Sequence, residues 1–452
     1  MVERCFADRA LAREVVRGTF PVRVDADRRP DLAERFGMGG WPSVVYLTPE
    51  GDWVTGSTYM DPVDLVDLAR RVRIYFDNPK RREDLERARG YLKERIAQEV
   101  PRGLHPPSSE LLQQLVDSTR TAVARGAHPG FEALTMLLEY GRLKGEGDAG
   151  EAALGMLDRL ACGPMRDRDG TFFLAPLTSD AAVVDREKNL AVNAGLLGTF
   201  ARAARQTGRE KYREVAVGLG EALRQGFYDP RNALFFAGYA GVCERALLNE
   251  EATPLRDPAF YTGWNALAVS AFLDLYRAVG EDRYLEIGRR VLAALRRRMV
   301  RADGGFRHFP NAPDDIPLLL EDQALLARAA LDLFEIDGRV EDLRFARHLA
   351  DTMLEQFAHG SGALHDRMPE PDRAATPALD RLLPSGNGVA VQVLLRLHAL
   401  TGHPPYRERA GGILTALVGP HIDRAAYLGA LCRGIIAYLH PSEPSKPRIE
   451  SL

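Results

Sequence analysis

Apolar residues recur every three or four positions through most of the chain after residue 108, which is the spacing of amphipathic helices. Short turns within successive helix pairs alternate with long loops between the pairs. The expected helices cover residues 110–125, 131–144, 150–162, 190–206, 210–226, 265–279, 283–299, 320–336, 341–357, 387–401, 406–418 and 424–439. Twelve such helices predict an all-α (α/α)6 barrel, a six-hairpin toroid, over residues 108–440. The long loops then leave one end of the barrel, where ligand sites are expected.

Two local signatures repeat along this helical region. Turns within hairpins carry a Gly four residues before a Tyr, at Gly208 and Tyr212, Gly280 and Tyr284, and Gly402 and Tyr406. After each pair, a turn leads into an aromatic or apolar residue, at Phe172, Phe235, Phe306 and Leu364. These signatures indicate a helical-hairpin repeat whose period is lengthened by loop insertions.

The first 80 residues follow another pattern. Phe20 to Val24 alternates apolar and polar residues, which predicts a strand, and a helix opens at Pro30. Two further strands are expected at residues 44–47 and 53–55, followed by an amphipathic helix after Pro62. This order is typical of the rear half of an α/β thioredoxin fold, in which Pro42 would be the structural cis-proline. We expect a truncated thioredoxin-like domain over residues 1–80, a linker over 81–107 and a C-terminal tail over 441–452.

Composition narrows the function classes. Lys and Arg total 60 against 63 Asp and Glu, so the net charge of −3 predicts no nucleic-acid partner. No apolar run approaches a membrane span, and the four cysteines have no paired spacing, so neither a membrane partner nor a metal site is expected. No Cys-X-X-Cys occurs, and no nucleotide fingerprint suggests a cofactor. We expect a cytoplasmic protein whose protein partners, if any, are unknown.

Five motifs, in this order along the chain, resemble a known family. They cover residues 24–31, 39–42, 264–265, 320–323 and 384–387. The family is that of the thioredoxin-domain-containing proteins that include spermatogenesis-associated protein 20. The resemblance implies a thioredoxin-like domain followed by a toroid similar to those of N-acylglucosamine 2-epimerase, cellobiose 2-epimerase and several glycoside hydrolases.

The chain also departs from the family pattern. The family's Cys-X-X-Cys would precede Met1, and a family His is replaced by Asp185. The Glu187–Lys188 pair and Asn193 match the same family motif. Glu187 is a candidate general acid, and Lys188 and Asn193 are candidate substrate-binding residues.

His308 is the best candidate for a catalytic base, because its loop leads into a helix that begins with Glu321 and Asp322. Adjacent residues point in different directions on a helix, so only one of these two acids is expected to face the cavity, with the other acting at the helix N-terminus. A structural role in the loop is the alternative for His308, and ion pairing is the alternative for Glu187.

Trp264 and Asn265, at the start of an inner helix, offer an aromatic platform and an amide for a sugar, with core packing as the alternative for Trp264. Ser385 and Asn387 are further substrate-binding candidates, although both residue types also cap helices. Asp380, a few residues upstream, is expected to reach the cavity.

These residues predict a carbohydrate-binding or carbohydrate-active toroid, with a small-molecule sugar as its partner. If it is an enzyme, we expect epimerase or isomerase chemistry rather than glycoside hydrolysis, beside a redox-inactive thioredoxin-like domain. A non-catalytic scaffold or binding protein is the alternative. A thiol-disulfide oxidoreductase is a second alternative, which requires a Cys-X-X-Cys upstream of Met1.

Overall fold

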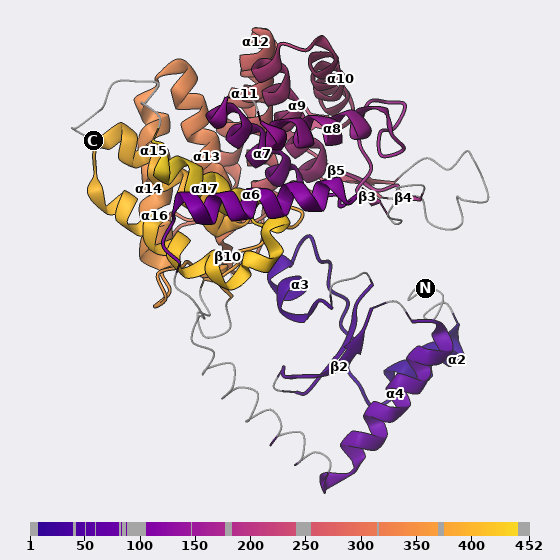
Figure 1. Ribbon diagram of the computed structural model, residues 1–452. Helices are drawn as coiled ribbons and strands as arrows, with labels where there is room; N and C mark the ends of the chain where they lie inside the picture. Colours follow the sequence, from indigo (N-terminus) through magenta and orange to yellow (C-terminus); the bar gives the residue numbers. More distant parts are fainter. Residues whose placement is uncertain are drawn as a thin grey trace. The chain divides into compact units, whose positions relative to one another are not determined.

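The computed structural model describes residues 8–38, 42–49, 51–58, 60–80, 83, 87, 105–145, 147–176, 183–240, 255–313, 316–368 and 375–441. The chain divides into two compact units, Met1–Arg102 and Gly103–Leu452 (Figure 1). Residue 41, most of the expected linker and the expected tail after residue 441 lie outside the described residues.

The N-terminal unit is a small α/β structure. Its elements are α2 (Arg9–Val16), α3 (Pro30–Phe36), β1 (Val44–Leu47), β2 (Trp53–Ser57) and α4 (Pro62–Asp77). The strands β1 and β2 pair antiparallel, and α2 packs against α4. The helices α2 and α4 begin where Asp8 and Asp61 accept backbone N–H groups of the first turn, as N-caps do.

The strand expected over Phe20 to Val24 does not form, which corrects the sequence-based prediction. This segment has no regular secondary structure, and the side chains of Phe20 and Val22 are 91% and 72% exposed. A strand needs a neighbour for its backbone hydrogen bonds, and among the described residues of this unit β1 and β2 pair only with each other. The alternation of apolar and polar residues therefore indicated a segment that favours β structure, but it could not show whether a neighbouring strand would pair with it.

The second unit is an (α/α)6 barrel, as predicted. Each hairpin pairs an outer helix with an inner helix, and α11 and α13, for example, are neighbouring inner helices (Figure 1). The inner helices are α7 (Phe131–Lys144), α9 (Leu190–Thr207), α11 (Thr262–Val279), α13 (Leu320–Asp337), α15 (Gly386–Thr401) and α17 (Gly429–Leu439). The outer helices are α6 (Ser109–Ala124), α8 (Asp148–Cys162), α10 (Glu210–Gly226), α12 (Asp282–Arg298), α14 (Val340–Gln356) and α16 (Pro404–Leu417). Each inner helix contacts the next, and α17 contacts α7, which closes the ring.

Burial distinguishes the two layers. Every residue of α11 from Thr262 to Leu275 is buried, because this helix is covered by its inner neighbours and by the outer layer. In contrast, α12 buries one apolar stripe and ends in three arginines. A helix that is apolar on all sides belongs in the interior, whereas an amphipathic helix belongs at the surface.

The repeated Gly and Tyr signature has a structural explanation. Gly208, Gly280 and Gly402 end inner helices with φ angles of 65°, 76° and 72°, in the left-handed region that favours glycine. The Tyr four residues later lies in the first turn of the next outer helix and is fully buried, as Tyr212 and Tyr284 show.

Short strands line the loops that precede the inner helices. They are β3 (Ala175–Pro176), β4 (Val184–Asp185), β5 (Lys188–Asn189), β6 (Tyr228–Asp229), β7 (Leu234–Phe235), β8 (Gly238–Tyr239), β9 (Arg256–Asp257), β10 (Leu318–Leu319) and β11 (Arg367–Met368). One predicted boundary differs clearly: residues 419–427 form a 3-10 helix, and α17 begins at Gly429 instead of residue 424.

Candidate functional site

Charged side chains meet along the axis of the barrel. All six inner helices contribute to this group, which contains five arginines and five acids. Its members are Glu132, Glu139, Arg202, Asp274, Arg277, Arg328, Asp332, Glu335, Arg396 and Arg433. We call these ten residues the axial charge chain. On α7, α11 and α13, which carry more than one member, the charged residues recur one or two turns apart and so share one face of the helix.

The first half of the axial charge chain links α7, α9, α11 and α17. Arg433 lies 2.6 Å from Glu132 and donates two further hydrogen bonds to the carboxylate of Glu139, at 2.9 and 3.0 Å. Arg202 donates to Glu139 at 3.1 Å and to Asp274 at 2.8 Å. Each carboxylate here therefore binds at least one arginine on another helix.

The second half continues from α11 through α13 to α15. Arg277 lies 3.4 Å from Asp274 and 3.5 Å from Glu335. Arg396 lies 2.8 Å from Glu335 and 2.9 Å from Asp332. The pairs thus run around the barrel interior and join helices that are far apart in the sequence.

The charges along the axis shift one another's pKa. Burial alone would raise the pKa of Glu132, but Arg433 and Arg328 outweigh burial and hold it below its ordinary value. The same balance, with Arg396 and Arg277 as the cations, lowers the pKa of Asp332. Burial lowers the pKa of Arg328, and Glu132 restores only part of it because Arg433 acts in the opposite direction. Glu132 and Asp332 are therefore both ionised at neutral pH.

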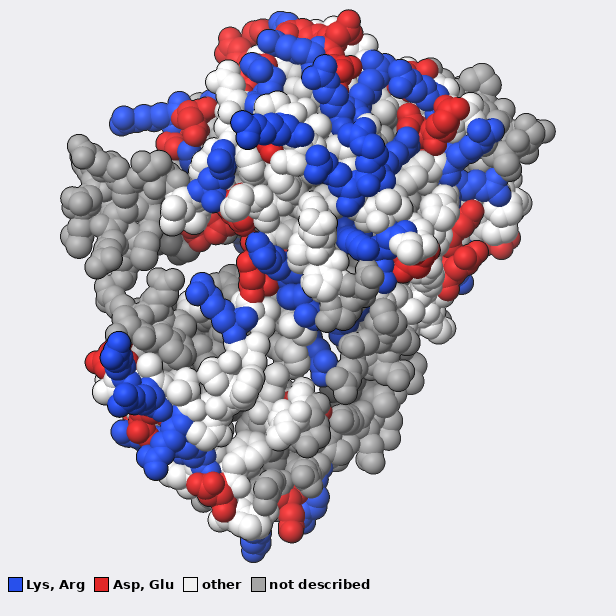
Figure 2. Space-filling model, turned by 180° about the vertical axis from the view of Figure 1, so that it is seen from behind, with Lys and Arg blue, Asp and Glu red and all other residues white. Residues whose placement is uncertain are grey.

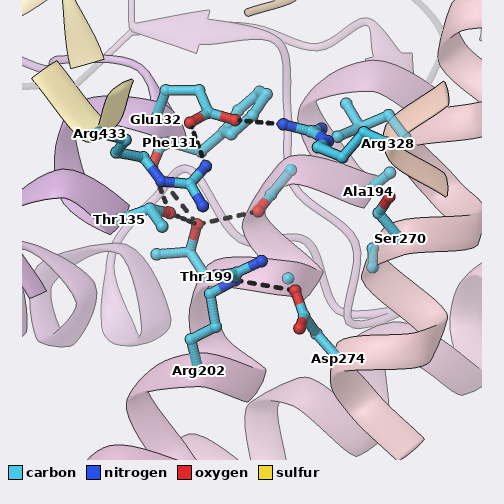
Figure 3. A pocket seen from close by; sticks show the side chains of 14 residues that line it. Phe131, Glu132, Thr135, Ala194, Thr199, Arg202, Ser270, Asp274, Arg328 and Arg433 are labelled. Carbon is cyan, nitrogen blue, oxygen red and sulfur yellow. Dashed lines mark hydrogen bonds and ion pairs between the residues drawn. The ribbon is translucent and has the colours of Figure 1, made fainter. Parts of the chain in front are cut away.

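A cavity of about 30 Å³ lies within the barrel, beside the first part of the axial charge chain (Figure 3). Five of the six inner helices contribute to its wall. Its polar lining consists of Glu132, Thr135, Thr199, Arg202, Ser270, Asp274, Arg328 and Arg433. Phe131, Gly195 and Gly198 lie among the other lining residues, and the cavity is partly open. The wall therefore combines guanidinium, carboxylate and hydroxyl groups around a small space.

None of the residues predicted from the sequence to be catalytic or substrate-binding lines this cavity. Asn193, Asn265 and Asn387 hold loops instead. Each amide oxygen accepts the N–H of one loop residue, and each amide nitrogen donates to the carbonyl of the same residue; these loop residues are Phe172, Phe235 and Leu364.

The second amide hydrogen of each Asn is also occupied, because it reaches another carbonyl, that of Asn189, Tyr261 or Pro377. All three side chains are fully buried. A sugar would find no amide hydrogen to accept, so the structure gives these residues a structural role instead of the predicted role in substrate binding. Gln323, which was not among the predicted site residues, makes the same pair of bonds with Phe306.

Trp264, Ser385 and Asp380 also have structural environments. Trp264 is 3% exposed and packs against the ring of Tyr261, so it presents no face on which a sugar could stack. Ser385 caps α15 by accepting the N–H of Gly388 at 3.0 Å, which confirms the helix cap expected from the sequence. Asp380 accepts the N–H groups of Ser385 and Ala430. These three predictions of substrate contact are therefore not retained.

His308 and Asp322 form a buried pair, in which His308 Nδ1 lies 2.9 Å from Asp322 Oδ2. The other oxygen of Asp322 accepts the N–H of Gly263 at 2.7 Å, so the carboxylate joins the His308 loop to the starts of α11 and α13. His308 is 2% exposed and stacks on Tyr261. A general base must reach the atom that it deprotonates, and this covered imidazole cannot do so in the observed conformation. Glu321, beside Asp322, is half-buried.

Of the predicted Glu187–Lys188 pair, Lys188 begins β5 and Glu187 directly precedes it. Lys188 contacts the carboxylates of Asp167 and Asp169 and lies 5.5 Å from the ring centre of Phe173. Glu187 is half-buried, and its backbone carbonyl accepts the N–H of Leu174 at 2.7 Å. Neither residue lines the cavity. Pro42 is described, but Trp41 is not, so the predicted cis peptide bond lies partly outside the described residues.

The axial charge chain was not predicted from the sequence, although a signal exists. On α13, Arg328, Asp332 and Glu335 occur four and three residues apart in a helix that is otherwise apolar over its central turns. A charged residue in a fully buried helix requires a partner. Similar spacing of Asp274 and Arg277 on α11 would have indicated a shared polar axis.

The surface and the remaining chemistry add few constraints. Acidic side chains lie among the basic ones on the face shown in Figure 2. Within the described ranges, no group of three or more His, Cys, Asp or Glu side chains could hold a metal ion. None of the helices that the structure describes is long and apolar enough to cross a membrane.

Comparisons with known proteins agree with this architecture. No protein-family model matches the sequence. Spermatogenesis-associated protein 20 of Homo sapiens is 24% identical over 562 aligned positions, which cover 92% of this chain and 71% of the human protein.

Solved structures resemble the toroid. A cellobiose 2-epimerase from Spirochaeta thermophila has a TM-score of 0.54 at 16% identity, covering 74% of this chain and 99% of that enzyme. A D-mannose isomerase also has a TM-score of 0.54, at 12% identity, covering 68% of this chain and 85% of its own. At such identities the likeness shows the fold alone. The chain is therefore a homologue of spermatogenesis-associated protein 20 over nearly its whole length, and its larger unit has a six-hairpin toroid fold.

Proposed function

We propose that the toroid binds a carbohydrate at the mouth of its central cavity. The observation that carries this proposal is the cavity itself, in which the hydroxyl groups of Thr135, Thr199 and Ser270 and several ionised groups converge on one space. Binding sites combine a concave shape with a few well-placed polar groups. The similarity of the fold to a cellobiose 2-epimerase and a D-mannose isomerase supports a sugar as the ligand.

We further propose that the ligand is bound without being converted. Epimerisation beside a carbonyl requires a base and an acid on opposite faces of one carbon, and no His lines the cavity among the residues that the structure describes. Glycoside hydrolysis requires one carboxyl group that keeps its proton near neutral pH. The pKa of Glu132 is lowered instead, because Arg433 and Arg328 outweigh the effect of burial. This assignment favours the binding-protein alternative over the predicted epimerase.

The N-terminal unit is proposed to be a thioredoxin-like domain without a redox role. Its order of helix, strand, strand and helix over α3, β1, β2 and α4 supports this proposal. The sequence contains no Cys-X-X-Cys. Disulfide exchange of the thioredoxin kind uses two neighbouring cysteines, which residues 1–452 do not supply.

The test is a thermal-shift and calorimetry screen of the full chain against neutral, amino and acidic monosaccharides and disaccharides. A ligand at 100 times its dissociation constant should stabilise the protein by about 2.7 kcal/mol, which shifts a cooperative melting curve visibly. Thr199→Val, which removes one cavity hydroxyl while keeping the side-chain shape, should weaken binding. A folded protein with an unchanged melting temperature across the whole panel would rule out the proposed function. NMR of a bound sugar after long incubation should show no epimer, and an epimer would restore the enzymatic alternative.

A further inference from the structure

We infer that the ligand of the central cavity carries a carboxylate group and that Arg328 binds it. The inference rests on the proposed function and narrows its ligand to an acidic sugar, such as a hexuronic acid. Arg328 is on α13, within the barrel, and its guanidinium group is part of the cavity wall (Figure 3).

Arg328 has fewer partners than its burial requires. It is 5% exposed, and within the described part of the chain its one polar contact joins Nη1 to Oε1 of Glu132 at 3.2 Å. Its Nε is buried and has no hydrogen-bond partner among the described residues. A guanidinium group has five N–H donors, and a buried donor without an acceptor destabilises the folded state. Such a group beside a cavity indicates that an acceptor belongs in the cavity.

The other arginines of the axial charge chain provide an internal comparison. Arg433 binds two carboxylates through three nitrogen atoms, and Arg202 binds two through two. Arg277 contacts Asp274 on its own helix, and Glu335 and the backbone carbonyl of Asp332 on α13. Arg396 contacts Asp332 and Glu335 on α13. Arg396 also has a buried nitrogen, Nη2, without a hydrogen-bond partner, but its guanidinium group lies 2.8 and 2.9 Å from two carboxylates. Among the described residues, Arg328 is the arginine of the axial charge chain that contacts a single carboxylate, and most of its donors remain for a ligand.

The charge around Arg328 favours an additional anion. Three arginines and two carboxylates line the cavity, and Glu139, just outside the wall, pairs with Arg202 and Arg433 but not with Arg328. Burial lowers the pKa of Arg328, which means that its surroundings do not fully stabilise its positive charge. A carboxylate beside it would supply the missing negative charge and two acceptor atoms in the geometry that guanidinium binds best.

Size determines how such a ligand would be placed. The cavity volume of about 30 Å³ is far below the roughly 300–1,000 Å³ of a pocket that encloses a small molecule. A carboxylate group can enter it, whereas a sugar ring must remain at the partly open mouth. The hydroxyl groups of Thr135 and Thr199 already bond to each other and to the carbonyls of Phe131 and Gly195, so their oxygens can serve only as acceptors for the part of the ring nearest to Arg328.

The experiment compares three ligands on the full chain by isothermal titration calorimetry at matched ionic strength. They are glucuronate, glucose and acetate, which present the carboxylate on a sugar, the sugar alone and the carboxylate alone. We expect glucuronate to bind at least tenfold more tightly than glucose, a difference of about 1.4 kcal/mol. Acetate should bind more weakly than glucuronate, because it lacks the ring contacts.

Two variants assign the effect to the cavity. Arg328→Gln should reduce glucuronate affinity to that of glucose, and it leaves Glu132 paired with Arg433 at 2.6 Å, so the fold should survive. Gly198→Ala places a methyl group in the cavity wall, 3.6 Å from Oδ2 of Asp274 and 3.7 Å from Cα of Ala271, which are ordinary contacts. Because Ala also favours a helix over Gly, this variant should fold well and lose glucuronate binding. Arg205→Gln is the control: Arg205 is exposed and lies on α9, the helix that also carries Gly198. This variant should bind glucuronate as the natural protein does.

The outcomes separate this inference from the proposed function. Equal affinity for glucose and glucuronate, unchanged in Arg328→Gln, would overturn the inference and leave sugar binding in place. Acetate binding as tight as glucuronate binding, lost in Arg328→Gln and without any glucose binding, would support Arg328 as a carboxylate site but overturn the sugar as its ligand. No binding of any of the three to folded protein would overturn the inference.

Discussion

Asp380 is a buried carboxyl group that joins the starts of two inner helices. It accepts the N–H of Ser385, the cap of α15, at 2.9 Å and the N–H of Ala430, in the first turn of α17, at 3.0 Å. Burial, reinforced by the negative charge of Glu132, raises the pKa of Asp380 to about 7. The protonated form is therefore stable in the folded protein at pH values where an unfolded chain has lost the proton.

This pKa shift predicts a pH dependence of stability. Between about pH 4 and pH 7 the folded state keeps the Asp380 proton while the unfolded state releases it, so the free energy of unfolding falls as the pH rises. The contribution of Asp380 to the free energy of unfolding is greatest below pH 4. It falls by roughly 1.4 kcal/mol per pH unit between pH 4 and pH 7, and the free energy of unfolding no longer changes through Asp380 above pH 7. Urea unfolding at several pH values measures this slope. Asp380→Asn should lack this component of the slope, and an identical pH profile in both proteins would contradict the assignment.

At the scale of elements, four amide side chains connect the two repeated signatures of the sequence. Asn193, Asn265, Gln323 and Asn387 lie in the first turns of α9, α11, α13 and α15. Each binds both backbone groups of the aromatic or leucine residue that ends the preceding loop turn. The repeat thus fixes every one of these loops to the helix that follows it. The sequence showed the turn residue and the amide, but only the folded chain brought them into contact.

Asn265→Asp tests this connection. An aspartate cannot donate to the carbonyls of Phe235 and Tyr261, which would remain buried without their partner. We expect the free energy of unfolding to fall by about 1–3 kcal/mol or more, measured by urea denaturation. Asn78→Asp, at an exposed position whose acceptor oxygen is retained, is the matched control and should change stability little. Equal stability of the two variants would show that the amide does not hold the loop.

Element prediction failed where a partner was needed. The helices of the toroid follow from the spacing of apolar residues within each helix, and their observed bounds agree with the prediction closely. Phe20 to Val24 has the alternation of a strand, yet a strand is stable only with a neighbour to pair with its backbone. His308 and Trp264 were singled out for their chemistry, but both lie in the core because loops and helices distant in the sequence cover them.

At the scale of the whole molecule, the axial charge chain is the interaction that joins all six inner helices. Buried ion pairs add little net stability compared with apolar packing, but the loss of one partner leaves a buried charge that nothing compensates. Arg433 is central to the chain because it contacts both Glu132 and Glu139. The ring of helices should therefore depend on Arg433 more than on any surface ion pair.

Arg433→Met is expected to lower the free energy of unfolding by about 3–5 kcal/mol, because it leaves Glu139 with Arg202 alone and weakens the compensation of Glu132. Arg290→Met removes an exposed pair with Glu286 and should change stability by less than about 1 kcal/mol. Chemical denaturation followed by circular dichroism measures both variants. Similar, small losses in the two proteins would show that the axial charge chain does not hold the barrel together.

The sequence by itself determined the number, order and approximate bounds of the toroid helices, because helix periodicity, capping and turn residues act within a few positions of one another. Only the tertiary structure decided where the polar site lies. Arg433 and Glu132 are 301 residues apart, and Arg328 and Glu132 are 196 apart, so no local pattern could show that they meet beside one cavity. Closure of the ring brings these charges together, and burial turns each of them into a group that must have a partner.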